Sequence, residues 1–286
     1  IFARLLGTPG RNEADPSRIL AVMVPLLFGY MFGDVGQGLV LFLAGIMLHK
    51  RWPLLRLLIA NGVSAMMFGF LFGSVFGRED LIPALWLHPI QQPLPVLIVP
   101  LIAGVLIILL GMAINAIESS WRGEWLRWLH IDAPVVGIYL GIVSAFFLQG
   151  STSVLIVVSA LTWYLVGNLL LAGGKILAVM TAIAALLEKM MQLLLNTLSF
   201  VRVGAFALAH AGLSLAFNIM ADNTTSIIVS LLILLLGNII VIVLEGLVVS
   251  IQTTRLVLFE FFIRFLQANG RVFKPLSGPL AGVTRP

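Results

Sequence analysis

The sequence predicts an all-α integral membrane protein with about eight transmembrane helices, the last two long and steeply tilted. Of its 286 residues, 60% are hydrophobic and only 10% are charged, whereas soluble domains carry roughly 25% charged residues. Apolar runs long enough to cross a hydrocarbon core of about 30 Å recur along the whole chain, and the polar segments between them are brief. The expected environment of the chain is therefore a lipid bilayer.

Hydrophobic patterning places the eight segments at about residues 19–33, 35–48, 54–76, 96–117, 133–148, 153–172, 177–220 and 226–266. The first two are short for a span, and only the Gly-rich run 33–38 separates them, so a single kinked helix is an alternative to a hairpin. A hairpin places nearly all basic loop residues on one side, which the positive-inside rule identifies as cytoplasmic together with both termini. These residues are Arg4, Arg11, Arg18, Lys50, Arg51, Arg56, Arg122, Arg127, Lys175, Arg264, Arg271, Lys274 and Arg285, against Arg78 on the opposite side.

The last two segments exceed the length that a bilayer requires. About 44 and 41 residues at 1.5 Å per residue give helices of roughly 60 Å or more. No proline lies between Pro134 and Pro275, so a break would depend on Gly173–Gly174, Gly204 or Gly237, and we expect tilt instead. The predicted organisation is a cytoplasmic lead-in (1–18), a six-helix membrane scaffold (19–172), two long tilted helices (173–268) and a cytoplasmic tail (269–286).

Several classes of site are excluded by composition. The chain has no cysteine, which rules out disulfides and cysteine-ligated metals, and its four histidines are scattered, which argues against a zinc site. No strand is expected before the Gly-rich run 33–38, and Gly173–Ile176 lacks the Ser or Thr of a phosphate loop. The net charge of +5 follows the membrane topology. We therefore predict no metal, no cofactor, no bound nucleotide and no nucleic-acid partner.

Ionisable residues within the apolar segments are confined to the last two. A charge near the bilayer centre costs several kcal/mol unless it is paired, hydrated or faces a cavity, so such residues are candidates for function. The first six helices then serve as scaffold. The candidates are Glu188, Lys189, Arg202, His210, Glu245, Arg255 and Glu260.

Arg202 is the first of these candidates. Its guanidinium stays protonated at physiological pH, so it cannot relay protons but can hold a positive potential at a fixed depth. Small residues follow it, and small residues allow close approach of another helix in a membrane. The alternative is a buried arginine that pairs with Glu188 or Glu245 for packing alone. The small residues are Gly204, Ala205, Ala207, Ala209, Ala211 and Gly212.

The other candidates also have two interpretations each. His210, about 12 Å beyond Arg202 along the helix, could carry protons near neutral pH or be a hydrogen-bonded structural group. Glu245 is flanked by apolar residues and indicates an ion path, although a structural ion pair is compatible. Glu188 lies on nearly the same face as Arg202, about 21 Å away, and could instead be a snorkelling group beside Lys189.

A glycine-rich motif occupies the expected hairpin tip. Its glycines, Gly33, Gly36 and Gly38, permit a tight turn, and Asp34 can bond the backbone there. We therefore interpret these four residues as a structural motif.

These motifs resemble those of one family, the membrane domain of V-type ATPase/ATP synthase subunit a, which is subunit I of bacterial and archaeal enzymes. The run Phe32–Gly38 resembles its hairpin motif, with Gln37 where His or Tyr is common. The segment from Arg202 to Ala211 resembles the one that bears the family's essential arginine. Further matches are Glu245–Leu247 followed by Arg255, the end from Phe259 to Pro275, and Leu5–Pro9, which resembles the junction after a large cytoplasmic domain that is missing here.

The resemblance implies a non-catalytic stator subunit of a rotary complex in a prokaryotic plasma (inner) membrane. Arg202 and Arg255 would face a rotating ring of proteolipid (c) subunits, and Glu188, Glu245 and His210 would line two aqueous half-channels for protons or sodium ions. Further implied partners are the peripheral stalk and the central-stalk socket subunits. Two other hypotheses stay open, a secondary ion-coupled transporter and a passive membrane anchor for a peripheral stalk.

Overall fold

The computed structural model describes residues 16–51, 55–79, 81–145, 151–171, 173 and 176–261, and it confirms an all-α fold over these residues. Most of the predicted lead-in and the predicted tail lie outside them. The helices are α2 (Pro16–Met31), α3 (Val35–Leu48), α4 (Arg56–Phe72), α5 (Pro93–Trp121), α6 (Trp125–Ala145), α7 (Ser151–Leu171), α8 (Ile176–Ser199), α9 (Val201–Asp222), α10 (Ile227–Ile240) and α11 (Gly246–Leu256). Two π-helical segments, Val241–Glu245 and Val257–Phe261, continue from α10 and α11.

Five helices in the described part of the chain are long and apolar enough to cross a membrane. They are Pro93–Trp121, Trp125–Ala145, Ser151–Leu171, Val179–Asp222 and Ile227–Phe261. The three helices before them have 16, 14 and 17 residues, or roughly 21–26 Å of helix, less than a core of about 30 Å. The chain is therefore a multi-pass membrane protein by length and composition, and the predicted count of eight spans is not confirmed.

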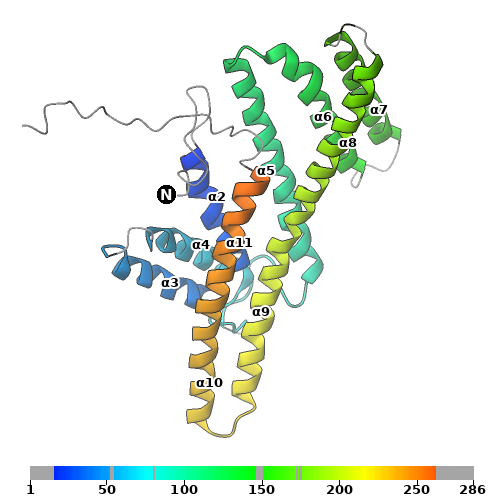
Figure 1. Cartoon of the computed structure of the whole chain (residues 1–286). Helices are drawn as coiled ribbons and strands as arrows, with labels where there is room; N and C mark the ends of the chain where they lie inside the picture. The colour runs from blue at the N-terminus through cyan, green and yellow to red at the C-terminus, as the bar shows by residue number, and fades with distance from the viewer. Residues whose placement is uncertain are drawn as a thin grey trace, which may run out of the picture.

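The first two predicted segments are separate helices, not one kinked helix. They do not form the expected antiparallel hairpin with each other, because α3 runs away from α2, and α4 returns along α3 to pack against α2 (Figure 1). Glycines allow this close approach. A Cβ at Gly62 would lie 2.6 Å from the backbone nitrogen of Phe42, and a Cβ at Gly38 would lie 2.8 Å from that of Met66.

The two long helices are continuous, as expected from the absence of proline. Helices α8 and α9 meet at Phe200, whose φ of −71° and ψ of −20° remain helical. The last helix passes from α10 to α11 through a π segment, and neither Gly204 nor Gly237 breaks its helix. Figure 1 shows the two rods side by side near the turn at residues 223–226 and diverging toward their other ends. Their tilt relative to a membrane stays a prediction.

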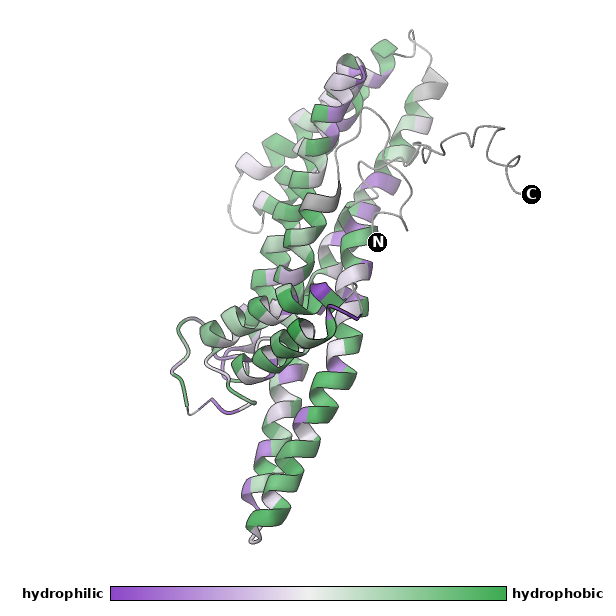
Figure 2. Cartoon of the chain, turned by 90° about the vertical axis from the view of Figure 1, so that its left-hand side faces the viewer, coloured by the Kyte–Doolittle hydropathy of each residue, from purple (hydrophilic) through white to green (hydrophobic). Residues whose placement is uncertain are grey.

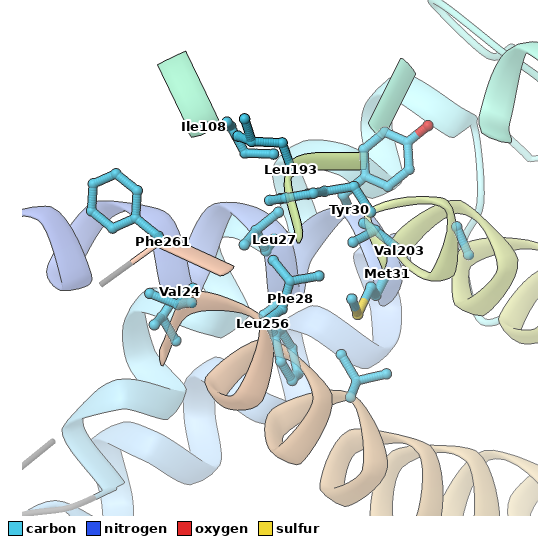
Figure 3. Packing of buried hydrophobic residues seen from close by; sticks show 14 of the residues in the cluster. Val24, Leu27, Phe28, Tyr30, Met31, Ile108, Leu193, Val203, Leu256 and Phe261 are labelled. Atoms are coloured by element: carbon cyan, nitrogen blue, oxygen red, sulfur yellow. The ribbon is translucent and has the colours of Figure 1, made fainter. Parts of the chain in front are cut away.

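Buried side chains of α2 hold the two long helices together. Figure 3 shows α2 residues packed against Leu256 and Phe261 of the last helix, Val203 of α9 and Ile108 of α5. In a bilayer such tight packing replaces the hydrophobic effect as the force that joins helices. Elsewhere the long helices are mostly hydrophobic on the outside, with hydrophilic residues at a few separate levels (Figure 2). The α2 residues are Val24, Leu27, Phe28, Tyr30 and Met31.

Candidate ion-translocation site

Two side-chain contacts join α9 to the last helix. Arg202 Nη1 donates to Gln252 Oε1 at 3.2 Å, and His210 Nδ1 lies 2.7 Å from Glu245 Oε2. His210 follows Arg202 by eight residues, whereas Glu245 precedes Gln252 by seven, so both contacts fit a single antiparallel register. Arg202 and the His210–Glu245 pair therefore lie at separate levels, about 12 Å apart along the axis.

Arg202 has neutral partners. Besides Gln252, its guanidinium donates from Nη2 to Ser199 Oγ at 3.0 Å, and the residue is half-buried. Among the residues that the structure describes, no carboxylate pairs with it, because Glu245 contacts His210, and Glu188 accepts a hydrogen bond from Gln192 Nε2 at 3.3 Å. The packing interpretation with Glu188 or Glu245 as partner is therefore not what the structure shows. A half-buried guanidinium without a counter-charge is costly in a membrane.

The small residues after Arg202 divide between two sides of α9. Ala205, Ala209 and Gly212 are exposed and follow the arginine at intervals of three or four residues, so they share its face. Gly204 lies on another side, where a Cβ would come within 2.4 Å of Val96 O in α5. Ala205, Ala209 and Gly212 are therefore available to a partner helix on the face of Arg202, whereas Gly204 packs against α5.

The His210–Glu245 pair is largely buried and lies at a π-helical segment of the last helix. The side chain of His210 is 5% exposed and that of Glu245 is 18% exposed. The imidazole packs on the ring of Phe32, with centroids 4.6 Å apart. Glu245 ends a π-helical segment, and such segments occur frequently at functional sites. The contact through Nδ1 leaves His210 Nε2 buried with no hydrogen-bond partner among the described residues.

A second polar region surrounds Arg255, on the side of Arg202 opposite to the His210–Glu245 pair. It is a cavity of ≈ 800 Å³ between α5, α6, α8 and the C-terminal part of the last helix, and we call it the charged cavity. Within it Lys189 Nζ contacts Asp132 Oδ1 at 2.7 Å. Its lining comprises Met112, Asn115, Trp128, Asp132, Val135, Val136, Lys189, Gln192, Leu193, Asn196, Arg255, Phe259 and Glu260.

Asp34 of the glycine-rich motif is fully buried and accepts four hydrogen bonds. Its Oδ1 accepts from the backbone N–H groups of Gln37 at 2.8 Å and Phe76 at 3.0 Å. Its Oδ2 accepts from Ser74 Oγ at 2.8 Å and from the backbone N–H of Gly77 at 2.7 Å. The carboxylate thus caps α3 and fixes the loop that follows α4.

The neighbouring glycines and Gln37 lie against this loop and the last helix. A Cβ at Gly33 would come within 2.5 Å of the Phe72 ring, and one at Gly36 within 2.4 Å of the Phe76 ring. Gln37 Nε2 donates to Asn238 Oδ1 at 2.9 Å. The motif therefore connects α3, the loop after α4, and α10.

The sequence matches several archaeal proteins named A-type ATP synthase subunit I over almost its whole length. No family model matches it. The A-type ATP synthase subunit I of Pyrococcus horikoshii is 28% identical over 312 residues, which cover 97% of this chain and 45% of that protein. The chain is a relative of subunit I. The corresponding protein of Thermococcus kodakarensis is 25% identical over 97% of this chain and 45% of its own length. The V-type ATP synthase subunit I 2 of Treponema pallidum is 38% identical over 28% of this chain and 19% of its own length.

These comparisons confirm the resemblance that the motifs indicated. The chain spans about half the length of the archaeal subunit I proteins that it matches. The matches carry no roles for individual residues, so the predicted site residues stay predictions.

Not all of the predicted site residues come together around Arg202. Glu245 and His210 form one pair, and Arg255 lines the charged cavity, but Glu188 is exposed and lies outside that cavity's lining. Asp132 was missed because the predicted segment begins at residue 133, whereas α6 begins at Trp125. The only signal for it was one acidic residue at the edge of an apolar run.

Replacing Asp34 with Asn is expected to destabilise the protein by about 1–3 kcal/mol, because an amide nitrogen would face backbone or hydroxyl donors at a fully buried site. Thermal unfolding of the detergent-solubilised protein, followed by circular dichroism, measures this. Asp222→Asn is the matched control, because Asp222 pairs with Arg78 at 3.0 Å while its side chain is 66% exposed. Equal midpoints for the two variants would show that the hydrogen bonds around Asp34 are dispensable.

Proposed function

We propose that the chain is the ion-translocating part of the stator of a rotary V-type or A-type ATP synthase. The observation that supports this best is the half-buried Arg202, which has no carboxylate partner within the described chain and shares an exposed face with small residues. A permanent cation in lipid needs a counter-charge. A rotating ring of proteolipid subunits, each with an ion-carrying carboxylate, would supply this counter-charge as each subunit moves past Arg202.

Arg202 would act as an electrostatic gate between two half-channels. Its charge stabilises the ionised ring carboxylate and so favours release of the bound ion. The same charge prevents an ion-loaded carboxylate from passing directly from one half-channel to the other, which would waste the gradient. The small side chains of Ala205, Ala209 and Gly212 allow the ring helix to approach the guanidinium closely.

The polar regions on either side of Arg202 provide the two half-channels in this proposal. The charged cavity with Arg255 lies farther from the 223–226 turn than Arg202 does, because residues 189–196 of α8 line it. In this proposal it opens to the cytoplasm, where the basic loops predict both termini. The His210–Glu245 pair lies toward the turn and would belong to the outer half-channel. Glu188 would contribute only at the surface, because it is exposed.

The remaining partners follow from the same proposal. The curated relatives are named as subunits of an ATP synthase, and we propose that this chain likewise works with a proteolipid ring, a peripheral stalk and the central-stalk socket in a prokaryotic plasma membrane. The chain itself would be non-catalytic.

Disulfide crosslinking tests the proposed contact with the ring, and the absence of native cysteines makes the background clean. We expect Ala205→Cys and Ala209→Cys to crosslink to a cysteine placed beside the ring carboxylate, with oxidation giving a chain–proteolipid product on a gel. Leu155→Cys is the control, because Leu155 is 72% exposed on α7, away from Arg202. A ring that copurifies but crosslinks at neither α9 position would contradict the proposed contact.

A further inference from the structure

The loop after α4 carries two titratable residues that the proposed function has not used. Glu79 and His88 approach each other, with Glu79 Oε2 3.7 Å from His88 Nδ1. Their side chains are 25% and 32% exposed, so both reach the protein surface. The loop is fixed to the rest of the fold by the hydrogen bonds to Asp34, and Asn218 Nδ2 donates to Phe76 O at 3.4 Å.

A small cavity lies between this loop and His210. Its volume is ≈ 10 Å³, about the space that one water molecule needs. Glu79 and His210 both line it, together with Gly33, Phe72, Ser74, Gly77, Pro89, Ala207 and Ala211. The loop therefore brings Glu79 to the same small space as His210.

One ring nitrogen of His210 lacks a partner that such a water could supply. Its Nδ1 contacts Glu245, whereas its Nε2 is buried with no hydrogen-bond partner in the described residues. A buried ring nitrogen without a partner is costly unless a water molecule satisfies it. Glu79 and Ser74 also line the cavity. The Ser74 hydroxyl donates to Asp34 and could only accept from the water, which makes the Glu79 carboxyl the group that can exchange a proton with it.

We infer that Glu79, assisted by His88, is the surface proton acceptor of the outer half-channel and exchanges protons with His210 through one water molecule. This rests on the proposed stator function and adds the mouth of the channel and its ion. A cavity of ≈ 10 Å³ is too small for a hydrated sodium ion. An imidazole, in contrast, is a proton carrier near neutral pH.

The transfer balances as a proton relay. The O–H bond of protonated Glu79 breaks as the water accepts its proton, and the water gives a proton to His210 Nε2. The N–H bond at His210 Nδ1 then breaks as an O–H bond forms at Glu245, which leaves the Nε2–H tautomer of the imidazole. Loss of one proton at Nε2 and gain of one at Nδ1 restore the starting tautomer before the next transfer. Of the described charged residues near Glu79, Arg78 pairs with Asp222, and Asp34 is enclosed by its four donors.

The test is proton transport by the intact rotary complex in liposomes, in sodium-free buffer, at several pH values. We expect Glu79→Gln to slow transport at least about tenfold, as loss of a positioned acid–base group does, and to alter its pH dependence. Glu79→Asp should retain most of the rate. Ala211→Val should also slow transport, because it fills the cavity without changing any charge. Asp222→Asn is the control in the adjacent ion pair and should transport normally.

A double variant distinguishes a relay from a merely structural loop. If Glu79 and His210 act in series, Glu79→Gln should cost little more in a His210→Gln background. Normal transport by Glu79→Gln, additive losses in the double variant, or a requirement for sodium would overturn the inference. If Arg202→Lys still abolishes transport in those cases, the proposed stator function stands. Normal transport by both Glu79→Gln and Arg202→Lys would reject the two proposals together.

Discussion

Replacing Arg202 with Lys is expected to abolish coupled ion transport while the complex still assembles. Lysine lacks the planar fork that reaches Gln252 and Ser199 together, and it can lose its proton when desolvated. The ring carboxylate would then lack its counter-charge, a loss of about 3 kcal/mol or more for a buried pair. Each 1.4 kcal/mol is about tenfold in rate, so we expect a loss of at least about 100-fold.

ATP-driven proton uptake in liposomes measures this loss, with native gel electrophoresis to confirm assembly. Arg56→Lys is the matched control, because Arg56 is exposed at the start of α4 and far from Arg202 in the chain. Full transport by the Arg202→Lys variant would contradict the need for a permanent charge. Full transport by Arg202→Ala would favour a passive membrane anchor.

Replacing Glu245 with Gln is expected to slow transport by about 100-fold or more, because a positioned general acid–base group contributes about 10²- to 10⁴-fold. The amide keeps the size of the side chain and can still hydrogen-bond His210, but it cannot take up and release a proton. The change therefore removes the relay at the 2.7 Å contact and leaves the packing in place. Transport rates between about pH 5.5 and 8.5 should lose the component that depends on this carboxylate.

Glu188→Gln is the comparison for this prediction. Glu188 is also a carboxylate on a long helix, but it is exposed and hydrogen-bonded to Gln192. We expect it to lose less than about threefold in rate, as for exposed groups that contribute under about 1 kcal/mol. Equal losses in the Glu188→Gln and Glu245→Gln variants would indicate that burial beside His210 does not determine the role of Glu245.

The sequence was sufficient for the membrane fold and for the candidates on the long helices. Arg202, His210 and Glu245 are conspicuous because a charge inside an apolar segment is expensive. The contacts between them could not be predicted in the same way. Periodicity gives the depth and the face of each residue on its own helix, but it does not give the register between α9 and the last helix. That register determines that Glu245 contacts His210 and not Arg202.

Other features had weak local signals. Glu79 and His88 lie in a loop, where polar residues are ordinary, and only the folded structure shows that Glu79 and His210 line the same small cavity. The π segment Val241–Glu245 contains no proline and no glycine, so the sequence carries no signal for it. Hydropathy merged loop residues with the short helix α4, so the segment expected at residues 54–76 is longer than the helix in the structure, Arg56–Phe72.

The hydrogen-bonding residues around Gln252 show the same limit. Ser250 and Thr254 lie two residues to either side of Gln252, and their hydroxyls donate to the helix backbone at Gly246 O and Ser250 O. Gln252 instead reaches the guanidinium of Arg202. The sequence does not distinguish a polar side chain that hydrogen-bonds to the neighbouring helix from one that hydrogen-bonds to its own backbone. Only the packing of α9 against the last helix shows which of them does which.

The position of Arg202 in the assembled complex tests the proposal most directly. Electron cryomicroscopy of the complex in lipid should place the Arg202 guanidinium within about 4 Å of a proteolipid carboxylate, the reach of an ion pair, with Ala205 and Ala209 against the ring helix. A ring seated on another face of the chain, with Arg202 facing lipid or a different subunit, would contradict the proposed stator.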